Sequence, residues 1–318
     1  MTTDSPVFIV LNIGSGRRDA ETTVATIQDI LTQAGRRHDI MRVDNPRQLP
    51  TLAQRAVALA QQQQGIVVAA GGDGTINAVV QAALYSGRPF GVLPQGTFNY
   101  FSRTHGIPSD TAEATRALLD ATVRPAQVGL INDRVFLVNA SLGLYPKILE
   151  DREAYKQQFG RSRLVALWSG VMTLLRQHRQ LVLGLEHAGE VRVMRTPTLI
   201  VGNNPLQLAQ VGISEAHAVQ NGQLAAIVVR PIGTLALFGL LFRSALGQLG
   251  DADHVITFAF ERLTIRPYGR RRIKVAMDGE VAWLKTPLVF QVAPKPLKLL
   301  VPARNSTPST ADAAAAVT

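Results

Sequence analysis

The sequence predicts an α/β unit with a parallel sheet, followed by an antiparallel β unit. Up to about residue 120, short apolar runs alternate with helical patterns, which is typical of parallel strands connected by helices. From about Val128 onward, short β-branched runs follow one another closely, which is typical of an antiparallel sandwich or barrel. We therefore place a domain boundary near Pro125, which divides the chain into residues 1–125 and 126–303.

Strands and helices alternate along the first segment. The expected strands are Val7–Leu11, His38–Val43, Gly65–Ala70 and Phe90–Pro94, and the expected helices are Asp19–Ala34, Leu52–Gln63 and Ile76–Tyr85. Glycine-rich turns follow several of these strands. Parallel sheets bind ligands at the carboxyl ends of their strands, so we expect a binding site at that edge.

Two apolar helical patterns interrupt the β runs of the second segment, over Ser162–Arg176 and Ile232–Leu249. Neither contains the roughly 18 uninterrupted apolar residues that cross a bilayer. Core or interdomain packing is the ordinary explanation for both. The alternative is that one of them flanks an opening for an acyl chain or lies in a membrane surface. The tail over residues 304–318 is small and polar, and we expect it to be disordered.

The composition describes a basic protein that is large enough for two cores. The chain has 318 residues, 46% of them hydrophobic, and a formal net charge of +10. Such a charge attracts nucleic acid, acidic lipid headgroups or nucleotide phosphates. Aromatic residues make up only 6% and do not interleave with the basic ones, so nucleic acid is not expected as the partner.

The start of the chain and its lack of cysteine bear on its compartment. No basic start followed by a long apolar stretch precedes the first strand, so we expect a cytoplasmic protein. The absence of cysteine excludes disulfides, thiolate chemistry and zinc fingers, and it agrees with a reducing compartment.

The densest group of basic residues is the segment RPYGRRRIK, from Arg266 to Lys274. One interpretation is a solvated rim of a hairpin. The other is contact with phosphate or with an anionic membrane surface.

The segment GGDGT follows an expected strand and opens an expected helix. Backbone N–H groups and the helix dipole favour anions there, and Gly71, Gly72 and Gly74 let phosphate oxygens approach the main chain. No Gly-Lys-Ser/Thr follows, so the turn is not a Walker A loop. Asn77 stands where the dinucleotide fingerprint needs its third glycine, which excludes that motif. A purely structural turn remains the alternative.

The next strand end carries a near-copy of this turn. The first turn reads Gly-Thr-Ile-Asn over residues 74–77, and the second reads Gly-Thr-Phe-Asn over residues 96–99. Adjacent parallel strands would bring Thr75, Asn77, Gly96, Thr97 and Asn99 to one crevice. The end of the first strand adds three more small or polar residues to the same edge, Asn12, Ser15 and Gly16.

Three motifs in this order, GGDGTIN, PQGTFNYFSR and MDGE, resemble the catalytic domain of diacylglycerol, sphingosine and ceramide kinases and of bacterial lipid kinases. The resemblance extends from about Val7 to Pro302. NAD kinases and phosphofructokinases share GGDG-like turns, but the second motif is similar to the lipid branch. The resemblance implies a three-layer nucleotide-binding domain and a β-sandwich domain, with ATP and lipid meeting between them.

The resemblance also implies the roles of individual residues. Residues 71–77 and Thr97 would line the ATP site, with Asn12 and Ser15 near the phosphates. Glu280 would accept the proton of the acceptor hydroxyl. Asp73 would either reach Mg²⁺ on the phosphates or share the role of Glu280, and we favour the metal because no lysine of the Walker type is present.

The segment MDGE allows two geometries. Asp278 and Glu280 alternate along a strand and could both face the cleft. Alternatively, Asp278 and Gly279 form a type I′ hairpin turn.

Three positions depart from the pattern of the bacterial branch. Gln127 stands where an aspartate near the active site is common, and Asn221 stands where an aspartate of a structural Mg²⁺ site is common. The loss of a carboxylate makes that structural metal doubtful. Val43 aligns loosely with a threonine near the nucleotide.

The function expected from these residues is an ATP- and Mg²⁺-dependent lipid kinase that meets its lipid at a membrane surface. One alternative is a kinase for a soluble nucleotide such as NAD. Another is a binding module without catalysis, which would follow from Gln127 and Asn221. The acceptor lipid and the oligomeric state, including a homodimer, stay open.

Overall fold

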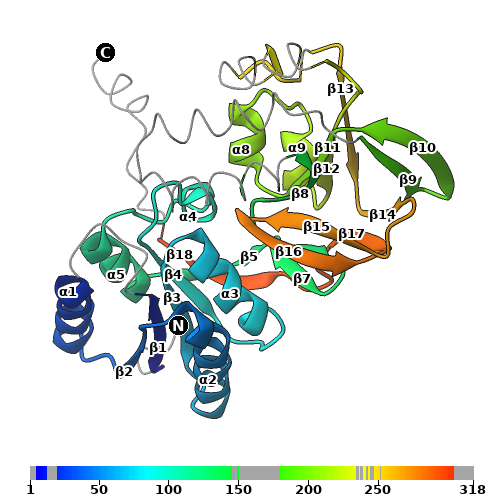
Figure 1. Ribbon diagram of the computed structural model, residues 1–318. Coiled ribbons are helices and arrows are strands. Elements are labelled where there is room, and N and C mark those ends of the chain that lie inside the picture. Colours follow the sequence, from blue (N-terminus) through cyan, green and yellow to red (C-terminus); the bar gives the residue numbers. More distant parts are fainter. Residues whose placement is uncertain are drawn as a thin grey trace, which may run out of the picture.

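The computed structural model describes two units that lie side by side (Figure 1). The residues described are 5–12, 20–144, 180–233 and 252–303, together with 146, 149, 236, 239, 240, 243 and 247–250. The expected apolar segment Ser162–Arg176, residue Ser15 and the tail 304–318 lie outside the described residues.

Sheet A forms the centre of the first unit, with strand order β2-β1-β3-β4-β18-β5. Its strands β1 to β4 are parallel, as the alternation predicts. They span Val7–Asn12, His38–Val43, Ile66–Gly71 and Phe90–Pro94. The first and third of these strands are buried almost throughout because helices cover both faces of the sheet.

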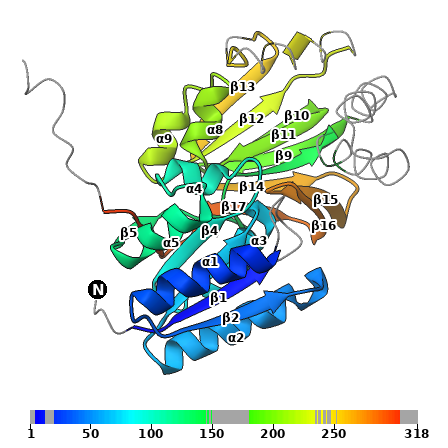
Figure 2. The ribbon, with the colours of Figure 1, turned by 90° about the vertical axis from the view of Figure 1, so that its left-hand side faces the viewer.

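The helices form the two outer layers around sheet A. Helices α1 (Ala20–Gln33) and α5 (Thr111–Leu119) pack together on one face. Helices α2 (Leu49–Gln62) and α3 (Asp73–Ala83) pack together on the other, as Figures 1 and 2 show. Each turns an apolar stripe to the sheet, such as Val24, Ile27 and Leu31 on α1. Short helices η2 (Pro46–Gln48) and α4 (Tyr100–Thr104) complete the unit.

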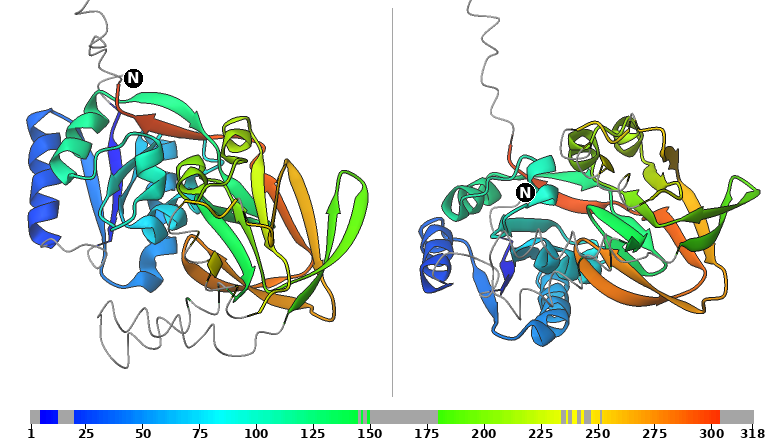
Figure 3. Two further views of the ribbon diagram at one scale, coloured as in Figure 1. Left: turned by 90° about the horizontal axis from the view of Figure 1, so that it is seen from above. Right: turned by 45° about the horizontal axis from the view of Figure 1, so that its top comes forward.

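The end of the chain returns to the first sheet. Strand β18 (Leu297–Val301) lies between β4 and β5 (Thr122–Ala126), and it pairs antiparallel with β5. Figure 3 shows the red β18 beside the green β5. The composition assigns residues 297–301 to the second domain, whereas the structure pairs them with the first sheet. We propose that the first domain is discontinuous, with residues 5–126 completed by residues 297–301.

Two antiparallel sheets pack face to face in the second unit. Sheet B has the order β10-β9-β14-β17-β6-β7 and sheet C the order β13-β12-β11-β8-β15-β16. Side chains of both sheets, among them Phe136, Phe260 and Phe290, fill the space between them. The strands are β6 (Gly129–Ile131), β7 (Arg134–Phe136), β8 (Asn139–Gly143), β9 (Leu181–His187), β10 (Glu190–Thr196), β11 (Thr198–Gly202), β12 (Leu224–Val229), β13 (Val255–Phe260), β14 (Arg262–Pro267), β15 (Arg272–Met277), β16 (Glu280–Lys285) and β17 (Leu288–Val292).

Helices α8 (Pro205–Gln210) and α9 (Ala216–Gln220) cover part of sheet C. Their apolar residues pack on Ile200, Ala225 and Ile227. The expected apolar segment Ile232–Leu249 is described only in part, and Leu240 packs there in a small core with Leu144 and Val229. Core packing thus accounts for the described part of this segment.

The fold class expected from the sequence is confirmed, with a parallel α/β unit and an antiparallel sandwich. A local difference that bears on the site concerns α3, which begins at Asp73 rather than near Ile76. The helix starts directly after Gly72, so the GGDGT segment belongs to its first turn.

Candidate active site

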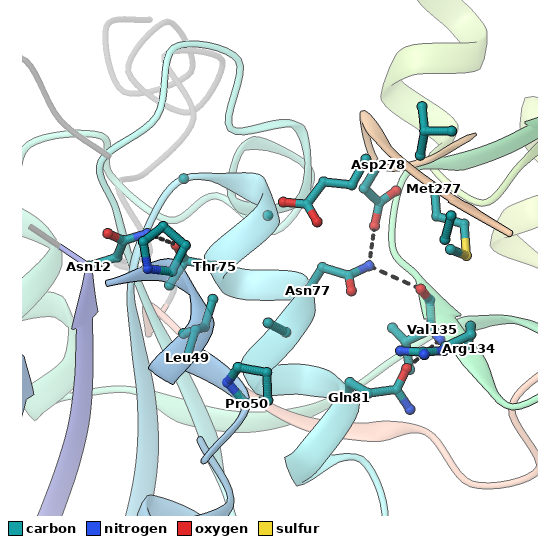
Figure 4. Close-up of a pocket in the computed structure, with 17 residues that line it drawn as sticks. Asn12, Leu49, Pro50, Thr75, Asn77, Gln81, Arg134, Val135, Met277 and Asp278 are labelled. Carbon is teal, nitrogen blue, oxygen red and sulfur yellow. Dashed lines mark hydrogen bonds between the residues drawn. The ribbon is translucent and has the colours of Figure 1, made fainter. Parts of the chain in front are cut away.

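A pocket of about 570 Å³ opens between the two units (Figure 4). The first unit contributes Asn12, η2, the start of α2 and residues along α3 as far as Gln81. The second unit contributes β7 and the hairpin formed by β15 and β16. The lining residues are Asn12, Pro46, Leu49, Pro50, Gly72, Gly74, Thr75, Asn77, Ala78, Gln81, Arg134, Val135, Met277, Asp278, Glu280, Val281 and Ala282.

The glycines of the first turn are needed for close packing. A Cβ on Gly71 would lie 2.6 Å from the Cβ of Thr75, so a side chain already fills that space. A Cβ on Gly74 would lie 2.7 Å from Oε1 of Glu280. The missing side chain of Gly71 thus makes room for Thr75, and the approach of a ligand to its main chain stays a prediction.

The two glycine turns pack directly against each other. A Cβ on Gly96 would lie 3.1 Å from the Cα of Gly72, and the backbone N–H of Gln95 donates to the carbonyl of Gly71. The expectation that adjacent strands bring both turns together is confirmed. A Cβ on Gly96 would therefore be crowded, whereas one on Gly72 would lie 3.6 Å from the Cα of Gly96, an ordinary contact.

Asn99 stabilises the second turn rather than reaching out of it. Its backbone has φ of 47°, a left-handed conformation that asparagine tolerates. Its Oδ1 accepts from the N–H of Gly96 at 3.1 Å, and its Nδ2 donates to the carbonyl of Gly96 at 2.9 Å. The side chain is buried and both its polar groups are used within the turn. Thr97, by contrast, is exposed.

The end of β1 contacts the first turn through Asn12. Its Nδ2 donates to Oγ1 of buried Thr75 at 3.0 Å. Val43 pairs with Asn12 in the register of β1 and β2, and its side chain is buried in the core. Asn12 and Thr75 therefore form a polar floor at the end of the sheet.

Asp73 occupies the first position of α3, and its Oδ1 is a buried carboxylate oxygen without a hydrogen-bond partner among the described residues. Burial raises the pKa of its carboxyl group above the usual range, and the charge of Asp278 raises it further. A hydrogen bond from the backbone of Asn99 opposes this rise. A cation or a proton at Oδ1 would remove the unfavourable charge.

Asp278 fastens the β15–β16 hairpin to the rest of the site. Its Oδ2 accepts from Nδ2 of Asn77 at 2.7 Å, as Figure 4 shows, and from the N–H of Leu137 at 2.7 Å. Its Oδ1 accepts from the N–H groups of Val138 and Asn139 at 2.8 and 3.1 Å. The interpretation of Asp278 and Glu280 as alternating strand residues is wrong, because β15 ends before Asp278 and β16 begins after Gly279.

The backbone confirms the hairpin turn that the alternative reading expects. Both Asp278 and Gly279 have positive φ, and Met277 pairs with Glu280 across the turn. Burial raises the pKa of the Asp278 carboxyl group, although its four hydrogen bonds lower it. With both oxygens saturated, Asp278 has a structural role that fixes the position of its neighbour Glu280.

Glu280 brings an exposed carboxylate to the start of α3. Its residue is solvent-exposed and lines the pocket, with Oε1 directly over Gly74. The contact joins residues more than two hundred positions apart. A carboxylate at this place can accept a proton from a ligand held at the helix N-terminus.

The pocket includes part of the set expected from the sequence. Six of the expected residues line it, namely Asn12, Gly72, Gly74, Thr75, Asn77 and Glu280. Gly71, Asp73, Gly96, Thr97 and Asn99 belong to the two turns but are absent from the lining.

Sequence reasoning missed two polar contributors, one from α3 and one from β7. Gln81 accepts from the N–H of Val135 at 2.9 Å and donates to the carbonyl of Asp133 at 3.0 Å. These bonds connect the two units. Arg134 follows Asp133 and brings a guanidinium group to the pocket. The spacing of four residues could have placed Gln81 on the face of helix α3 that carries Asn77, one turn further along.

The positions that depart from the bacterial pattern lie away from the pocket. Nε2 of Gln127 donates to Oδ1 of Asn203 and to the carbonyl of Gln223, both at 2.9 Å. Gln127 thus connects the two units with neutral hydrogen bonds and does not line the pocket. Asn221 is exposed at the end of α9. Over the described part of the chain, no three acidic or histidine side chains gather in a way that could hold a metal ion.

The architecture defines a class of protein in which a glycine turn at the carboxyl edge of a parallel sheet meets a hairpin from a β-sandwich. Residues 6–131 match the family model of the diacylglycerol kinase catalytic domain, so this segment of the chain is similar to that domain.

Individual relatives agree with this family. The chain is 32% identical over 150 residues to a diacylglycerol kinase of Bacillus subtilis, covering 45% of this chain and 47% of the relative. It is 31% identical over 137 residues to a diacylglycerol kinase of Staphylococcus haemolyticus, covering 42% and 41%. In these matches the chain spans somewhat less than half the length of the curated relatives.

A solved structure shares the fold over nearly the whole chain. The crystal structure of a diacylglycerol kinase from Bacillus anthracis superposes with a TM-score of 0.70 at 19% identity, covering 95% of this chain and 98% of the other. At this identity the likeness concerns the fold. Among the described residues, no helix combines the length and apolar character that crossing a membrane requires.

Proposed function

We propose that this chain is an ATP-dependent lipid kinase, which transfers the γ-phosphoryl group to a hydroxyl of a diacylglycerol-like lipid. The observation that carries the proposal is the carboxylate of Glu280 over Gly74, at the N-terminus of α3. The helix N-terminus favours phosphate, and the carboxylate can take a proton. Phosphoryl transfer needs both at one place.

The chain's own residues supply positioning and a proton acceptor. The acceptor hydroxyl oxygen attacks the γ-phosphorus as the bond from that phosphorus to the bridging oxygen breaks, and ADP leaves. The hydroxyl proton moves to Glu280. Asp278 holds the hairpin so that Glu280 remains over the helix, and Asn77 connects Asp278 to α3.

Mg²⁺ is the cation that this family implies, and Asp73 fits it. The buried Oδ1 of Asp73 lacks a partner among the described residues, and its raised pKa reflects an unfavourable charge. A divalent cation would neutralise that charge together with the phosphates of ATP. When bound, Mg²⁺ supplies charge neutralisation to the transferred group. We assign Asp73 to this metal and Glu280 to the proton.

The position of Arg134 supports the binding of nucleotide phosphates in this pocket. The first turn provides no lysine, so a nucleotide bound there needs a cation from elsewhere. The guanidinium of Arg134 enters from the second unit and lines the same pocket. We therefore include Arg134 among the residues that contact phosphate, next to the turn over residues 71–77 and to Thr97 of the second turn.

The apolar part of the pocket supports a lipid acceptor. Pro46, Leu49 and Pro50 line it from the first unit, and Val281 and Ala282 line it from the hairpin. A soluble nucleotide such as NAD would not need this surface. A pocket that has both polar and apolar lining residues suits an amphiphile with a reacting hydroxyl in its headgroup.

A direct test is transfer from labelled ATP to lipid with purified protein, Mg²⁺ and a panel of hydroxyl-bearing lipids in mixed micelles. We expect a labelled lipid product and no transfer to NAD. Phosphorylation of NAD without lipid would overturn the substrate class. Binding of ATP without product from any acceptor would favour a module without catalysis.

The metal assignment has its own test. Asp73→Asn should raise the Mg²⁺ concentration needed for half-maximal rate and lower the rate itself, because one oxygen ligand loses its charge. Gln127→Asn, in the neutral contact between the units, serves as the control and should leave the Mg²⁺ dependence unchanged. A lower rate at unchanged Mg²⁺ dependence in Asp73→Asn would assign Asp73 to proton transfer instead.

A further inference from the structure

The outer face of the β15–β16 hairpin carries cations and an exposed tryptophan. The register pairs Arg272 with Lys285 and Lys274 with Trp283. The intervening residues Ile273, Val275 and Leu284 point the other way into the core. The alternation of a strand therefore places four residues together on the outer face. We call the surface formed by Arg272, Lys274, Trp283 and Lys285 the basic–aromatic face.

The tryptophan of this face is unusually exposed for its size. Trp283 is 54% exposed, and Nζ of Lys274 lies 5.4 Å from its ring centroid. Arg272 and Lys285 are exposed as well. A cation over the ring is favourable, but an exposed indole remains costly in water. The indole needs a surrounding that is partly apolar and partly polar.

The charges of the surrounding residues are also mainly positive. Arg270 and Arg271, in the turn before β15, are exposed, and their carbonyls accept from the hydroxyl and the N–H of Thr286. None of the six outward positions on β15 and β16 is acidic. The acidic residues of this hairpin, Asp278 and Glu280, lie at its tip and line the pocket.

We propose that the basic–aromatic face docks on the surface of an anionic lipid bilayer. Cations near such a surface gain about 1 kcal/mol each, and tryptophan favours the boundary between headgroups and acyl chains. Residues of the same strand continue into the pocket, because Val281 and Ala282 line it. The face would thus hold the pocket next to the lipid leaflet. This inference rests on the proposed lipid substrate.

Fluorescence of Trp283 gives the most direct measurement. The chain contains two tryptophans, so Trp168→Phe leaves Trp283 as the only one. We expect a blue shift and quenching by brominated acyl chains with vesicles of phosphatidylglycerol, and neither with vesicles of phosphatidylcholine. Unchanged emission and no quenching in phosphatidylglycerol would overturn the proposal.

Vesicle co-sedimentation of the otherwise unchanged protein tests the same claim without the Trp168 substitution. Arg272→Gln with Lys285→Gln should weaken binding to phosphatidylglycerol vesicles by about 20-fold, since two charges are lost. Arg116→Gln with Arg124→Gln removes the same charge from exposed positions on α5 and β5 and should change binding less than about threefold. Equal losses in the two pairs would show attraction by net charge alone and would overturn the proposal.

The aromatic contribution has a matched pair of its own. Trp283→Ala should weaken vesicle binding several-fold, whereas Tyr85→Ala, at a residue that is 59% exposed in the first unit, should not. Binding of Trp283→Ala equal to that of the unsubstituted protein would contradict docking through this face.

Assays in two lipid systems, nonionic mixed micelles and phosphatidylglycerol vesicles, distinguish the docking face from the proposed kinase activity. In nonionic mixed micelles, Arg272→Gln with Lys285→Gln should retain full transfer, while in phosphatidylglycerol vesicles it should lose activity in parallel with binding. Full activity and binding in vesicles would reject the docking face and leave the kinase standing. Transfer to no lipid in either system would reject the kinase, while vesicle binding would still be measurable.

Discussion

The two Gly-Thr-x-Asn turns are nearly identical in sequence and differ in what their side chains do. In the first turn, Thr75 is buried under Asn12, and Asn77 reaches across to Asp278 of the second unit. In the second turn, Thr97 is exposed and Asn99 bonds to Gly96 within the same turn.

A repeated motif thus fixes where a turn lies, whereas the contacts around the turn fix what its side chains do. Both turns follow adjacent parallel strands, so both come to one edge of sheet A. Only the first meets the hairpin of the second unit. We interpret the first turn as the connection between the units and the second as its support.

We expect the largest effect from Asp278→Ala, which removes the hydrogen bond between the first turn and the hairpin of the second unit. Asp278→Ala would leave the N–H groups of Leu137, Val138 and Asn139 without their acceptor and would place alanine at positive φ. We expect a loss of about 4 kcal/mol in the free energy of unfolding, measured by urea denaturation. Glu280→Ala, two residues away and exposed, should change it by less than about 0.5 kcal/mol. Equal stability of the two variants would contradict the role of Asp278.

The second turn should respond to changes of its own asparagine. Asn99→Ala loses both hydrogen bonds to Gly96 and forces alanine into a left-handed conformation, so we expect a loss of about 3 kcal/mol. Asn99→Gly tolerates that conformation and should lose about 2 kcal/mol. Thermal unfolding of both variants measures the difference. If glycine were the worse substitution, the backbone would not be the reason for asparagine here.

The helix after the second turn should make the protein sensitive to acid. Burial lowers the pKa of His105 from 6.5 to about 4. As the pH falls below 6.5 the unfolded chain binds a proton that the folded chain refuses, so stability falls until about pH 4, by about 3 kcal/mol in all.

His105→Gln should remove this part of the pH dependence, as measured by urea unfolding at several pH values between 7.5 and 4. The raised pKa values of Asp73 and Asp278 act in the opposite direction, since their stabilisation grows as the pH falls. Both aspartates are present in the unsubstituted protein and in His105→Gln, so their contribution cancels when the two pH profiles are subtracted. A parallel pH profile for His105→Gln would contradict a buried neutral histidine.

The smallest expected effect compares the two threonines. Thr75→Ala loses the hydrogen bond from Asn12 in a buried site and should cost about 1 kcal/mol of unfolding free energy. Thr97→Ala, at an exposed site, should change stability by less than about 0.5 kcal/mol. An increase in KM for ATP in Thr97→Ala at unchanged stability would then report contact with the nucleotide. A larger stability loss in Thr97→Ala than in Thr75→Ala would reverse the interpretation of the two turns.

Much of the fold and part of the site follow from local patterns. The alternation of apolar runs and helices predicts strands β1 to β4 and their parallel direction, and the glycine turns after β3 and β4 predict where the pocket edge lies. The hairpin around Asp278 and Gly279 follows from turn chemistry.

Other features depend on long-range contacts that no local pattern contains. Residues 297–301 return to sheet A because β18 pairs there with β4 on one side and with β5 on the other. The saturation of Asp278 depends on N–H groups about 140 residues earlier in the chain. Gln81 and Arg134 reach the pocket because α3 meets β7, and the reason for Gly71 lies in the packing of Thr75. Sequence spacing predicts that a site lies at the carboxyl edge of sheet A, whereas packing determines which side chains reach the pocket there.

The central claim is that Glu280 accepts the proton at the N-terminus of α3, and Glu280→Gln tests it most directly. The substitution keeps the shape of the side chain and removes its charge. We expect kcat for lipid phosphorylation to fall by about 100-fold or more, while ATP affinity, measured by calorimetry, and the free energy of unfolding stay close to their original values. A Glu280→Gln protein with unchanged kcat would contradict the claim.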